Sequence, residues 1–438
     1  MIIHELIDRL PDKFEKPQVD GTSDQNDSVK DSVETNQPNL QSENAQGKNL
    51  SVDELMKAAL DEPLFYPKLQ ESVFAGDTVG IALQSNLPHP KLILEALLKQ
   101  LNSANVDPAD IVVVVSPRTA RRLEIDPSLY EITDEQKTSG ERPGVFPVEF
   151  GFNSINFQVH DPEIETGLAY IIANAAGEPV HINRMLVDAD VVLPVSCPVA
   201  GEANQQIDCL YPEFASEVIK GRFADGKGSF LSRWEEIEIA NDTLGSFFSI
   251  QIICGPGDKI ERVICGARKD ATDAARLATN ELWAFQWEGQ ADVTVATIEM
   301  EETDQTWDDF AHALITASRL STPDAPIVIC SEIAVMPDRN IRKALLSQFE
   351  TGISGKLTKT MQHVAAIVNE RPVFLHSKLK SNSIEELGIG FIETIDEVLR
   401  IAEPHEQGLL IRDAHRCQVK ADSNANDNST DREVLKDA

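Results

Sequence analysis

Short apolar runs alternate with amphipathic segments along most of the chain, and this pattern predicts an α/β fold. The runs DTVGIAL, DIVVVVS and DVVLPVS, which end at Leu83, Ser116 and Ser196, are short enough to indicate buried strands. Residues 89–104 lie between the first two runs and have helical spacing, so we expect a βαβ unit there. Such a unit implies a mostly parallel sheet that is covered on both faces.

The same alternation resumes after Ala267 and predicts a second α/β domain. Helical segments alternate there with the apolar runs DVTVATI, PIVICSE, PVFLHS and GLLIRD. Residues 248–268 differ, because the turn sequence GPGD joins two apolar runs and predicts a hairpin that closes the first domain.

Polar segments at both ends of the chain are expected to be disordered. Residues 18–50 contain no aromatic residue, and residues 421–438 are equally polar, so neither segment can bury enough apolar surface to become ordered. We therefore expect an arm over 1–50, α/β domains over 51–267 and 268–419, and a tail over 420–438. Proteins of this class bind ligands at the carboxyl ends of strands and between domains, so we expect a small-molecule ligand in an interdomain cleft.

Charge and cysteine content exclude several classes of partner and compartment. The 438 residues carry a formal net charge of −33, which disfavours a nucleic-acid or anionic membrane partner. No segment has the apolar length of a membrane span. Six cysteines without a C-x-x-C pair are typical of a reduced, cytoplasmic protein. The oligomeric state is not predicted.

Local motifs offer only weak candidates for catalysis. The sequence has no Walker A loop, no G-x-G-x-x-G after a strand, no G-x-S-x-G elbow and no metal-ligand spacing among its histidines. His160 precedes Asp161, and the pair is either a base with its orienting carboxylate or a loop pair that caps the chain. His312 shares a helical face with Asp308 and Asp309, which either stabilise its charged form or form a surface ion cluster with it.

The order of these segments over residues 51–419 resembles the lactate racemase family. The resemblance is carried by AGDTVGIALQSNLPHPKLILEALLKQL, DIVVVVSPRTARR, GEPVHINRMLVDADVVLPVS and RPVFLHSKLKSNSIEELGIGFIETIDEVL. It implies two α/β domains and a nickel-pincer nucleotide that is tethered to a lysine and moves the hydride of a 2-hydroxy acid. It also implies two histidine bases on opposite faces of the substrate and a third histidine that ligates nickel.

The first two loops of that pattern depart from the family. Where the family reads D-D-x-T-R-P, this chain has Gln84, Ser85 and Asn86 followed by Leu87, and leucine cannot replace the phosphate-binding arginine. Where the family reads T-H-R, Arg118 is retained but Pro117 occupies a catalytic histidine position. The resemblance therefore makes Gln84, Ser85, Asn86 and Arg118 candidate cofactor-binding residues.

The segment that follows Ser196 resembles the family loop that carries the tether. The tethering lysine falls on Asp208, which cannot form the covalent link, and the paired glycines fall on Gln205 and Gln206. The nickel-ligating histidine falls on Cys197 or Pro198, so Cys197 is the candidate metal ligand. In the second domain, the lysine of the family's Y-Q-x-x-K falls on His312.

These replacements predict a divergent lactate-racemase-like protein that binds a small molecule or is a pseudoenzyme, and they assign no cofactor. Two alternatives stay open. One is an active 2-hydroxy-acid racemase or epimerase with a non-covalently held nickel-pincer nucleotide. The other is a different enzyme in the same cleft, with Cys197, Asp208, His160 and His312 as its candidate catalytic residues.

Overall fold

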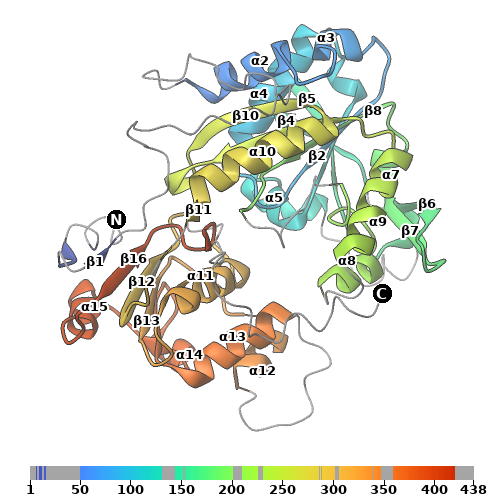
Figure 1. The fold of residues 1–438 in the computed structure, drawn as a ribbon. Coiled ribbons are helices and arrows are strands. Elements are labelled where there is room, and N and C mark those ends of the chain that lie inside the picture. Colours follow the sequence, from blue (N-terminus) through green and yellow to red (C-terminus); the bar gives the residue numbers. More distant parts are fainter. Residues whose placement is uncertain are drawn as a thin grey trace, which may run out of the picture.

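The computed structural model describes most of the expected ordered chain. The described residues are 6, 9–11, 14–15, 50–130, 144–150, 153–200, 210–224, 230–285, 287, 289–300, 305–337, 339–346 and 359–419. They form two α/β halves, each built around its own sheet (Figure 1). No helix among these residues is long and apolar enough to cross a membrane.

The first half contains a seven-stranded sheet in the order β10-β9-β8-β2-β3-β5-β4. Its central strands β2, β3, β5, β8 and β9 run parallel, and the edge strands β10 and β4 are antiparallel to their neighbours. The strands are β2 (Val79–Leu83), β3 (Ile111–Val115), β4 (Phe146–Phe150), β5 (Asn153–Val159), β8 (Val191–Ser196), β9 (Phe248–Cys254) and β10 (Ile260–Ala267). Both the expected parallel sheet and the expected hairpin are confirmed.

Helices cover both faces of this sheet, as its fully apolar strands require. Successive residues of β2 alternate between two cores: Ile81 and Leu83 pack with α2 and α4, whereas Ala82 packs on the opposite face. The covering elements are α2 (Val52–Asp61), α3 (Leu69–Ser72), α4 (Pro90–Ser103), α5 (Pro117–Arg122), α7 (Arg184–Val187), α8 (Glu217–Ala224), α9 (Phe230–Thr243), and the hairpin of β6 (Leu168–Ala173) and β7 (Pro179–Asn183). The capping box of Ser51 and Glu54 begins α2, as predicted.

The second half contains a six-stranded sheet in the order β1-β16-β12-β13-β14-β15, in which every pair is parallel. Its strands are β1 (Phe14–Glu15), β12 (Val293–Thr297), β13 (Ile327–Cys330), β14 (Val373–His376), β15 (Gly390–Phe391) and β16 (Gly408–Ile411). Its helices are α11 (Trp307–Leu320), α12 (Arg339–Leu346), α13 (Lys359–Glu370), α14 (Ser381–Glu385) and α15 (Ile395–Ala402). The predicted capping box of Thr394 and Glu397 begins α15.

The segment after Ala267 packs on the first sheet. Helix α10 (Arg268–Trp283) lies against β9, where the indole Nε1 of Trp283 donates to the carbonyl of Cys254 at 2.8 Å. Beyond it, β11 (Ala284–Phe285) pairs with β17 (Gln418–Val419), so the two ends of the second half lie together. The division of the chain at residue 267 stays a prediction.

Strand β1 lies within residues 1–50, the range that the sequence predicts to be disordered. Phe14 pairs with Gly408 of β16, and the Phe14 ring lies 2.7 Å from where a Cβ of Gly408 would be, so this position has no room for a side chain. Leu6 is buried against the same core. Most other residues of the range, and the tail over 420–438, lie outside the described residues.

Candidate functional site

The candidate residues of the first half follow the carboxyl ends of neighbouring parallel strands. Gln84, Ser85 and Asn86 follow β2, Arg118 lies in α5 directly after β3, and Cys197 follows β8. Because β2 pairs with both β3 and β8 in parallel, the three segments meet at one edge of the sheet. This is the edge where open α/β sheets bind ligands.

The loop after β2 holds Cys197 in place through two side-chain amides. The Oε1 of Gln84 accepts a hydrogen bond from the backbone N–H of Cys197 at 2.7 Å. The Nδ2 of Asn86 donates to the Cys197 carbonyl at 3.0 Å. These two candidates therefore fix the backbone of Cys197.

Glu213 joins this edge, although the sequence did not single it out. Its Oε1 accepts from the backbone N–H of Ser85 at 2.8 Å. Burial raises the pKa of Glu213 to about 7, while the bond from Ser85 and the charges of Lys220 and Arg118 act in the opposite direction. Glu213 therefore exchanges its proton near neutral pH.

The second half reaches this edge through the segment that follows β16. Arg416 Nη2 donates to Asp258 Oδ1 at 2.6 Å, and the two side chains are only 8% and 4% exposed. Asp413 accepts from the backbone N–H of Gly257 in the first half and of Glu299 in the second half, each at 3.0 Å. We call this contact, made by Gly257, Asp258, Asp413 and Arg416, the interdomain junction.

Both aspartates of the junction have an uncommon backbone conformation. Asp258 has φ 62° and Asp413 has φ 47°, in the left-handed region that few side chains tolerate. Each lies in a tight turn directly after a strand, and each is held there by charge-assisted hydrogen bonds across the junction.

Cys197 lies against the junction with its thiol fully buried. A hydrogen bond from the Cys254 thiol lowers the pKa of Cys197 and outweighs the effect of burial, which raises it. Arg416 adds to the lowering with its Nη1 at 3.9 Å from the Cys197 Sγ. Arg416 thus stabilises an aspartate and a thiolate of the first half from the second half.

His415, beside Arg416, is the least satisfied polar group of the junction. Its side chain is 8% exposed, and neither ring nitrogen has a hydrogen-bond partner among the described residues. Burial lowers its pKa well below the usual value, and the positive charges of Arg416, His312 and Arg118 lower it further. His415 is therefore a neutral imidazole, with one donor and one acceptor that have no partner among the described residues.

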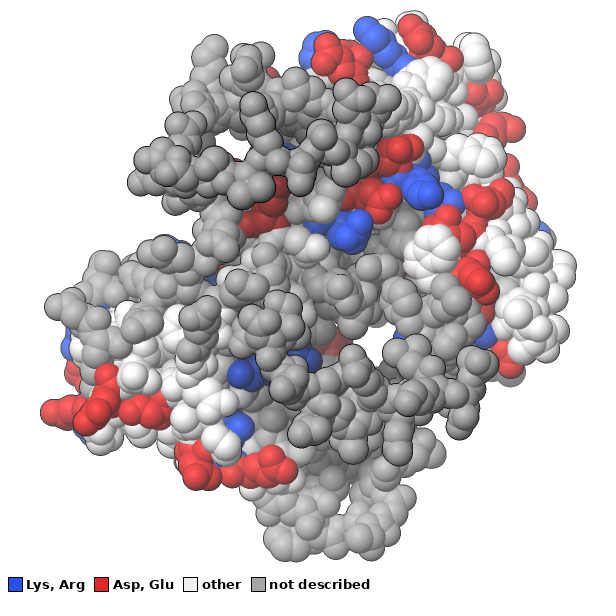
Figure 2. Space-filling view, viewed as in Figure 1, with Lys and Arg blue, Asp and Glu red and all other residues white. Residues whose placement is uncertain are grey.

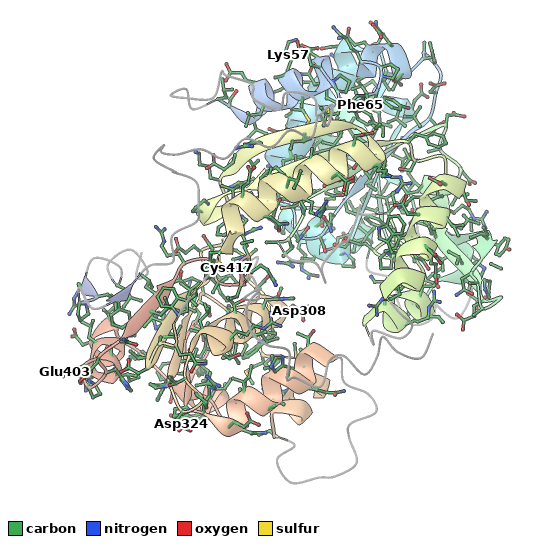
Figure 3. The ribbon with its side chains drawn as sticks, viewed as in Figure 1. Lys57, Phe65, Asp308, Asp324, Glu403 and Cys417 are labelled. Carbon is green, nitrogen blue, oxygen red and sulfur yellow. The ribbon has the colours of Figure 1, made fainter. Side chains whose placement is uncertain are left out.

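Asp308, which belongs to the predicted face with Asp309 and His312, lies on the side of the second half that faces the first, as does Cys417 (Figure 3). The Asp309 carboxylate accepts from the backbone N–H of Thr306 at 2.8 Å, which caps α11, and lies 3.8 Å from Arg118 Nη2. Asp309 of the second half therefore contacts Arg118 of the first half.

His160 has a different environment. Its Nε2 lies 3.1 Å from the Ala215 carbonyl and its Nδ1 lies 3.3 Å from Asn183 Nδ2, so both ring nitrogens have partners. Burial lowers the pKa of His160 to about 4. Asp161 accepts from the backbone N–H of Glu163, which is a local turn bond. The choice between the two alternatives for this pair stays a prediction.

Gln205, Gln206 and Asp208 lie in residues 201–209, outside the described part of the chain. The candidates that the structure brings together, at the carboxyl ends of β2, β3 and β8, are Gln84, Ser85, Asn86, Arg118 and Cys197. Sequence reasoning missed Glu213, Asp258, Asp413, His415 and Arg416. The available signal was the charged segment RDAHR directly after the last apolar run, at the end of a parallel strand.

Comparisons with solved structures show that the fold is lactate-racemase-like. The chain is similar to the lactate racemase apoprotein from Thermoanaerobacterium thermosaccharolyticum, with a TM-score of 0.61 and 16% identity over 85% of this chain and 93% of that one. It is also similar to a protein from Thermotoga maritima, with a TM-score of 0.58 and 13% identity over 85% of this chain and 98% of that one. No protein-family model and no curated protein matches it.

The described residues do not fit the nickel-pincer nucleotide that the resemblance implies. Leu87, at the position of the phosphate-binding arginine, is fully buried in the apolar core of the first half. Pro117, at the position of a catalytic histidine, begins α5 and has no proton to exchange.

Proposed function

We propose that this chain binds a small molecule at the interdomain junction and is a divergent, lactate-racemase-like protein without the tethered cofactor. The observation that carries the proposal is His415, a buried imidazole that follows β16 and whose two ring nitrogens have no partner among the described residues. A buried polar group without a partner costs about 1–3 kcal/mol, so a bound ligand is the natural source of its missing hydrogen bonds.

The surrounding groups support binding in preference to the family's chemistry. Racemisation by hydride transfer needs a base on each face of the substrate, and the position of one family base holds Pro117. The described cysteines are free thiols, which supports the cytoplasm as the compartment. The experiments below must therefore be able to reveal two alternatives. One is a racemase that holds its cofactor without a tether, and the other is an enzyme that uses the Cys197 thiol.

The decisive measurement is thermal unfolding of the wild-type protein and of His415→Phe with a panel of neutral and charged metabolites. A ligand at one hundred times its Kd stabilises the folded state by about 2.7 kcal/mol, which raises Tm by several degrees. We expect such a shift for at least one compound in the wild type and its loss in His415→Phe, whose ring offers no polar atom. Equal shifts in both proteins would place the ligand elsewhere and overturn the proposal.

A second measurement tests the cofactor directly. The protein is produced together with the enzymes that make the nickel-pincer nucleotide, and its nickel content and intact mass are measured beside a lactate racemase treated in the same way. We expect no stoichiometric nickel and an unmodified mass. Nickel at one equivalent would establish the alternative of an active 2-hydroxy-acid racemase that holds its cofactor without the lysine.

A further inference from the structure

Two cysteines of the first half lie at the carboxyl ends of neighbouring strands and face the same core. Cys197 directly follows β8, Cys254 is the last residue of β9, and the two strands pair in parallel. Side chains alternate between the two faces of a strand, so Cys197 shares a face with Val195. Cys254 likewise shares a face with Ile250, which is the register partner of Val195. All four side chains belong to one hydrophobic core, so the two thiols lie on the same side of the sheet.

Both sulfur atoms contact the same buried ion pair. The Nη1 of Arg416 lies 3.9 Å from the Cys197 Sγ, and its Nη2 donates to Asp258 Oδ1 at 2.6 Å. The Cys254 Sγ lies 3.7 Å from that same Oδ1. The strand register and these three contacts together place the two thiols around one guanidinium and one carboxylate. The hydrogen bond from the Cys254 thiol that lowers the pKa of Cys197 agrees with this placement.

We propose that Cys197 and Cys254 form a modification site, at which a small uncharged peroxide oxidises the two thiols to a disulfide. This inference goes beyond the proposed function and does not depend on the ligand of His415. Cys197 is the attacking group, because Arg416 stabilises its thiolate, and Cys254 is the thiol that completes the bridge.

The reaction balances with the peroxide as the only oxidant. The Cys197 thiolate attacks one oxygen of hydrogen peroxide, so an S–O bond forms and the O–O bond breaks with release of hydroxide. The Cys254 sulfur then attacks the sulfur of the resulting sulfenic acid, so an S–S bond forms and the S–O bond breaks. The second hydroxide takes the proton of Cys254, and the first takes the proton that Cys197 gave up. Two thiols are oxidised to a disulfide while one peroxide is reduced to two molecules of water.

Charge and burial define the class of oxidant. Acidic side chains are spread over both halves of the face seen in Figure 2, and the net charge of −33 disfavours the approach of anionic oxidants. Cys197 and Cys254 are at most 3% exposed, so an oxidant reaches them through local opening of the fold and must be small. Hydrogen peroxide meets both conditions.

The disulfide would change what the second half contacts on the first. A disulfide sulfur carries neither a negative charge nor a thiol proton. Arg416 would no longer face a thiolate, and Asp258 would no longer face a thiol donor. The ion pair of Arg416 and Asp258 itself needs neither sulfur and is retained.

The test is oxidation of the reduced full chain by hydrogen peroxide, followed by intact-mass measurement and by peptide mapping without reduction. We expect a loss of about 2 Da, the mass of two hydrogen atoms, and one linked pair of peptides that contain Cys197 and Cys254. Dithiothreitol should restore the original mass. An unchanged mass under conditions that fully oxidise free cysteine, or a bridge between other cysteines instead, would overturn the proposal.

Two variants identify the role of each sulfur. Cys254→Ser keeps a hydrogen-bond donor of similar size but cannot form the bridge. Peroxide should then add oxygen to Cys197, about 16 Da for each atom, without any loss of 2 Da. Cys197→Ser should give neither a bridge nor oxygen on Cys254. Oxygen on Cys254 in that variant, added as fast as the bridge forms in the wild type, would reject the order of attack.

Cys265→Ser is the matched control. Cys265 belongs to the same core and lies on β10, next to β9, and its thiol contacts the carbonyl of Ala59 at 2.9 Å. This variant should form the bridge between Cys197 and Cys254 as readily as the wild type, and loss of the bridge there would contradict the assignment. If Cys254→Ser does not fold, the peptide map of the oxidised wild type still decides.

Discussion

Two buried histidines, His160 in the first half and His415 beside the interdomain junction, differ in their hydrogen-bond partners. Both are less than a tenth exposed, and burial lowers the pKa of both. His160 has a partner for each ring nitrogen, whereas His415 has none among the described residues.

The comparison teaches that burial and pKa do not distinguish these two histidines, but their hydrogen-bond partners do. His160 packs edge-on against Phe214 and belongs to the core that fixes the β6–β7 segment. The surroundings of His415 are cationic groups from both halves of the molecule. A buried polar group that has no hydrogen-bond partner within the fold is expected at a functional site, because it does not contribute to stability.

The largest effect is expected when the ion pair of Arg416 and Asp258, next to His415, is removed. Arg416→Ala leaves Asp258 buried without its partner, so we expect the free energy of unfolding to fall by about 3–5 kcal/mol. Urea denaturation measures this loss. The exposed pair of Arg9 and Asp396 is the control, since Arg9→Ala should cost about 0–1 kcal/mol. If both variants lost the same free energy of unfolding, the buried pair of Arg416 and Asp258 would stabilise the fold no more than an exposed pair does.

The two buried thiols Cys197 and Cys330 allow a second comparison, which shows how neighbouring groups change the pKa of a buried side chain. Both are at most 1% exposed, but Cys254 and Arg416 lower the pKa of Cys197, whereas burial raises the pKa of Cys330 to about 12. At about pH 7.5 we expect iodoacetamide to modify Cys197 at least about one hundred times faster than Cys330, as followed by peptide mass spectrometry. Equal rates in the folded protein would show that access alone controls both thiols.

Replacing each histidine by phenylalanine compares the two sites directly. His160→Phe leaves the Ala215 carbonyl and the Asn183 amide without the partner they have in the wild type, so the free energy of unfolding should fall by about 2 kcal/mol. His415→Phe strands no hydrogen-bond partner in the described chain and should change stability by less than about 0.5 kcal/mol or increase it. Denaturation of both variants checks the difference, and a reversed order would remove the basis for calling His415 unsatisfied.

The smallest expected effect is the contribution of His160 to the pH dependence of stability. Its folded pKa of about 4 lies below the usual value of 6.5, so the unfolded chain binds the proton more readily. Stability is therefore lost as pH falls below about 6.5, by about 1 kcal/mol from this group between about pH 7.5 and 5.5. His160→Gln should lack this component, measured as unfolding free energy at both pH values, and an unchanged slope would contradict it.

Strands were predictable because a central strand of these sheets is buried on both faces and therefore consists of consecutive apolar residues. The runs that end at Leu83, Ser116 and Ser196 became β2, β3 and β8. Turn chemistry likewise predicted the hairpin of β9 and β10. Local sequence carried these elements because their burial pattern and turns depend on neighbouring residues only.

The site was predictable only on the side where residues follow strands of the first sheet. Cys197, Arg118 and the loop after β2 were found in this way. His415 and Arg416 were missed because their role depends on Asp258 and Cys197, which lie 158 and 219 residues away from Arg416 in the chain. The spacing of apolar and polar residues along the chain does not show which residues of one sheet contact the other sheet.

Strand β1 has a practical consequence for any shortened form of this protein. Residues 1–50 look dispensable from their composition, but Phe14 covers the outer side of β16 and fills the space beside Gly408. A chain that begins at Leu50 would leave the N–H and C=O groups of β16 as an open edge, which is a template for pairing with another molecule. Such a shortened chain should self-associate more strongly than the full chain, and light scattering would show the difference.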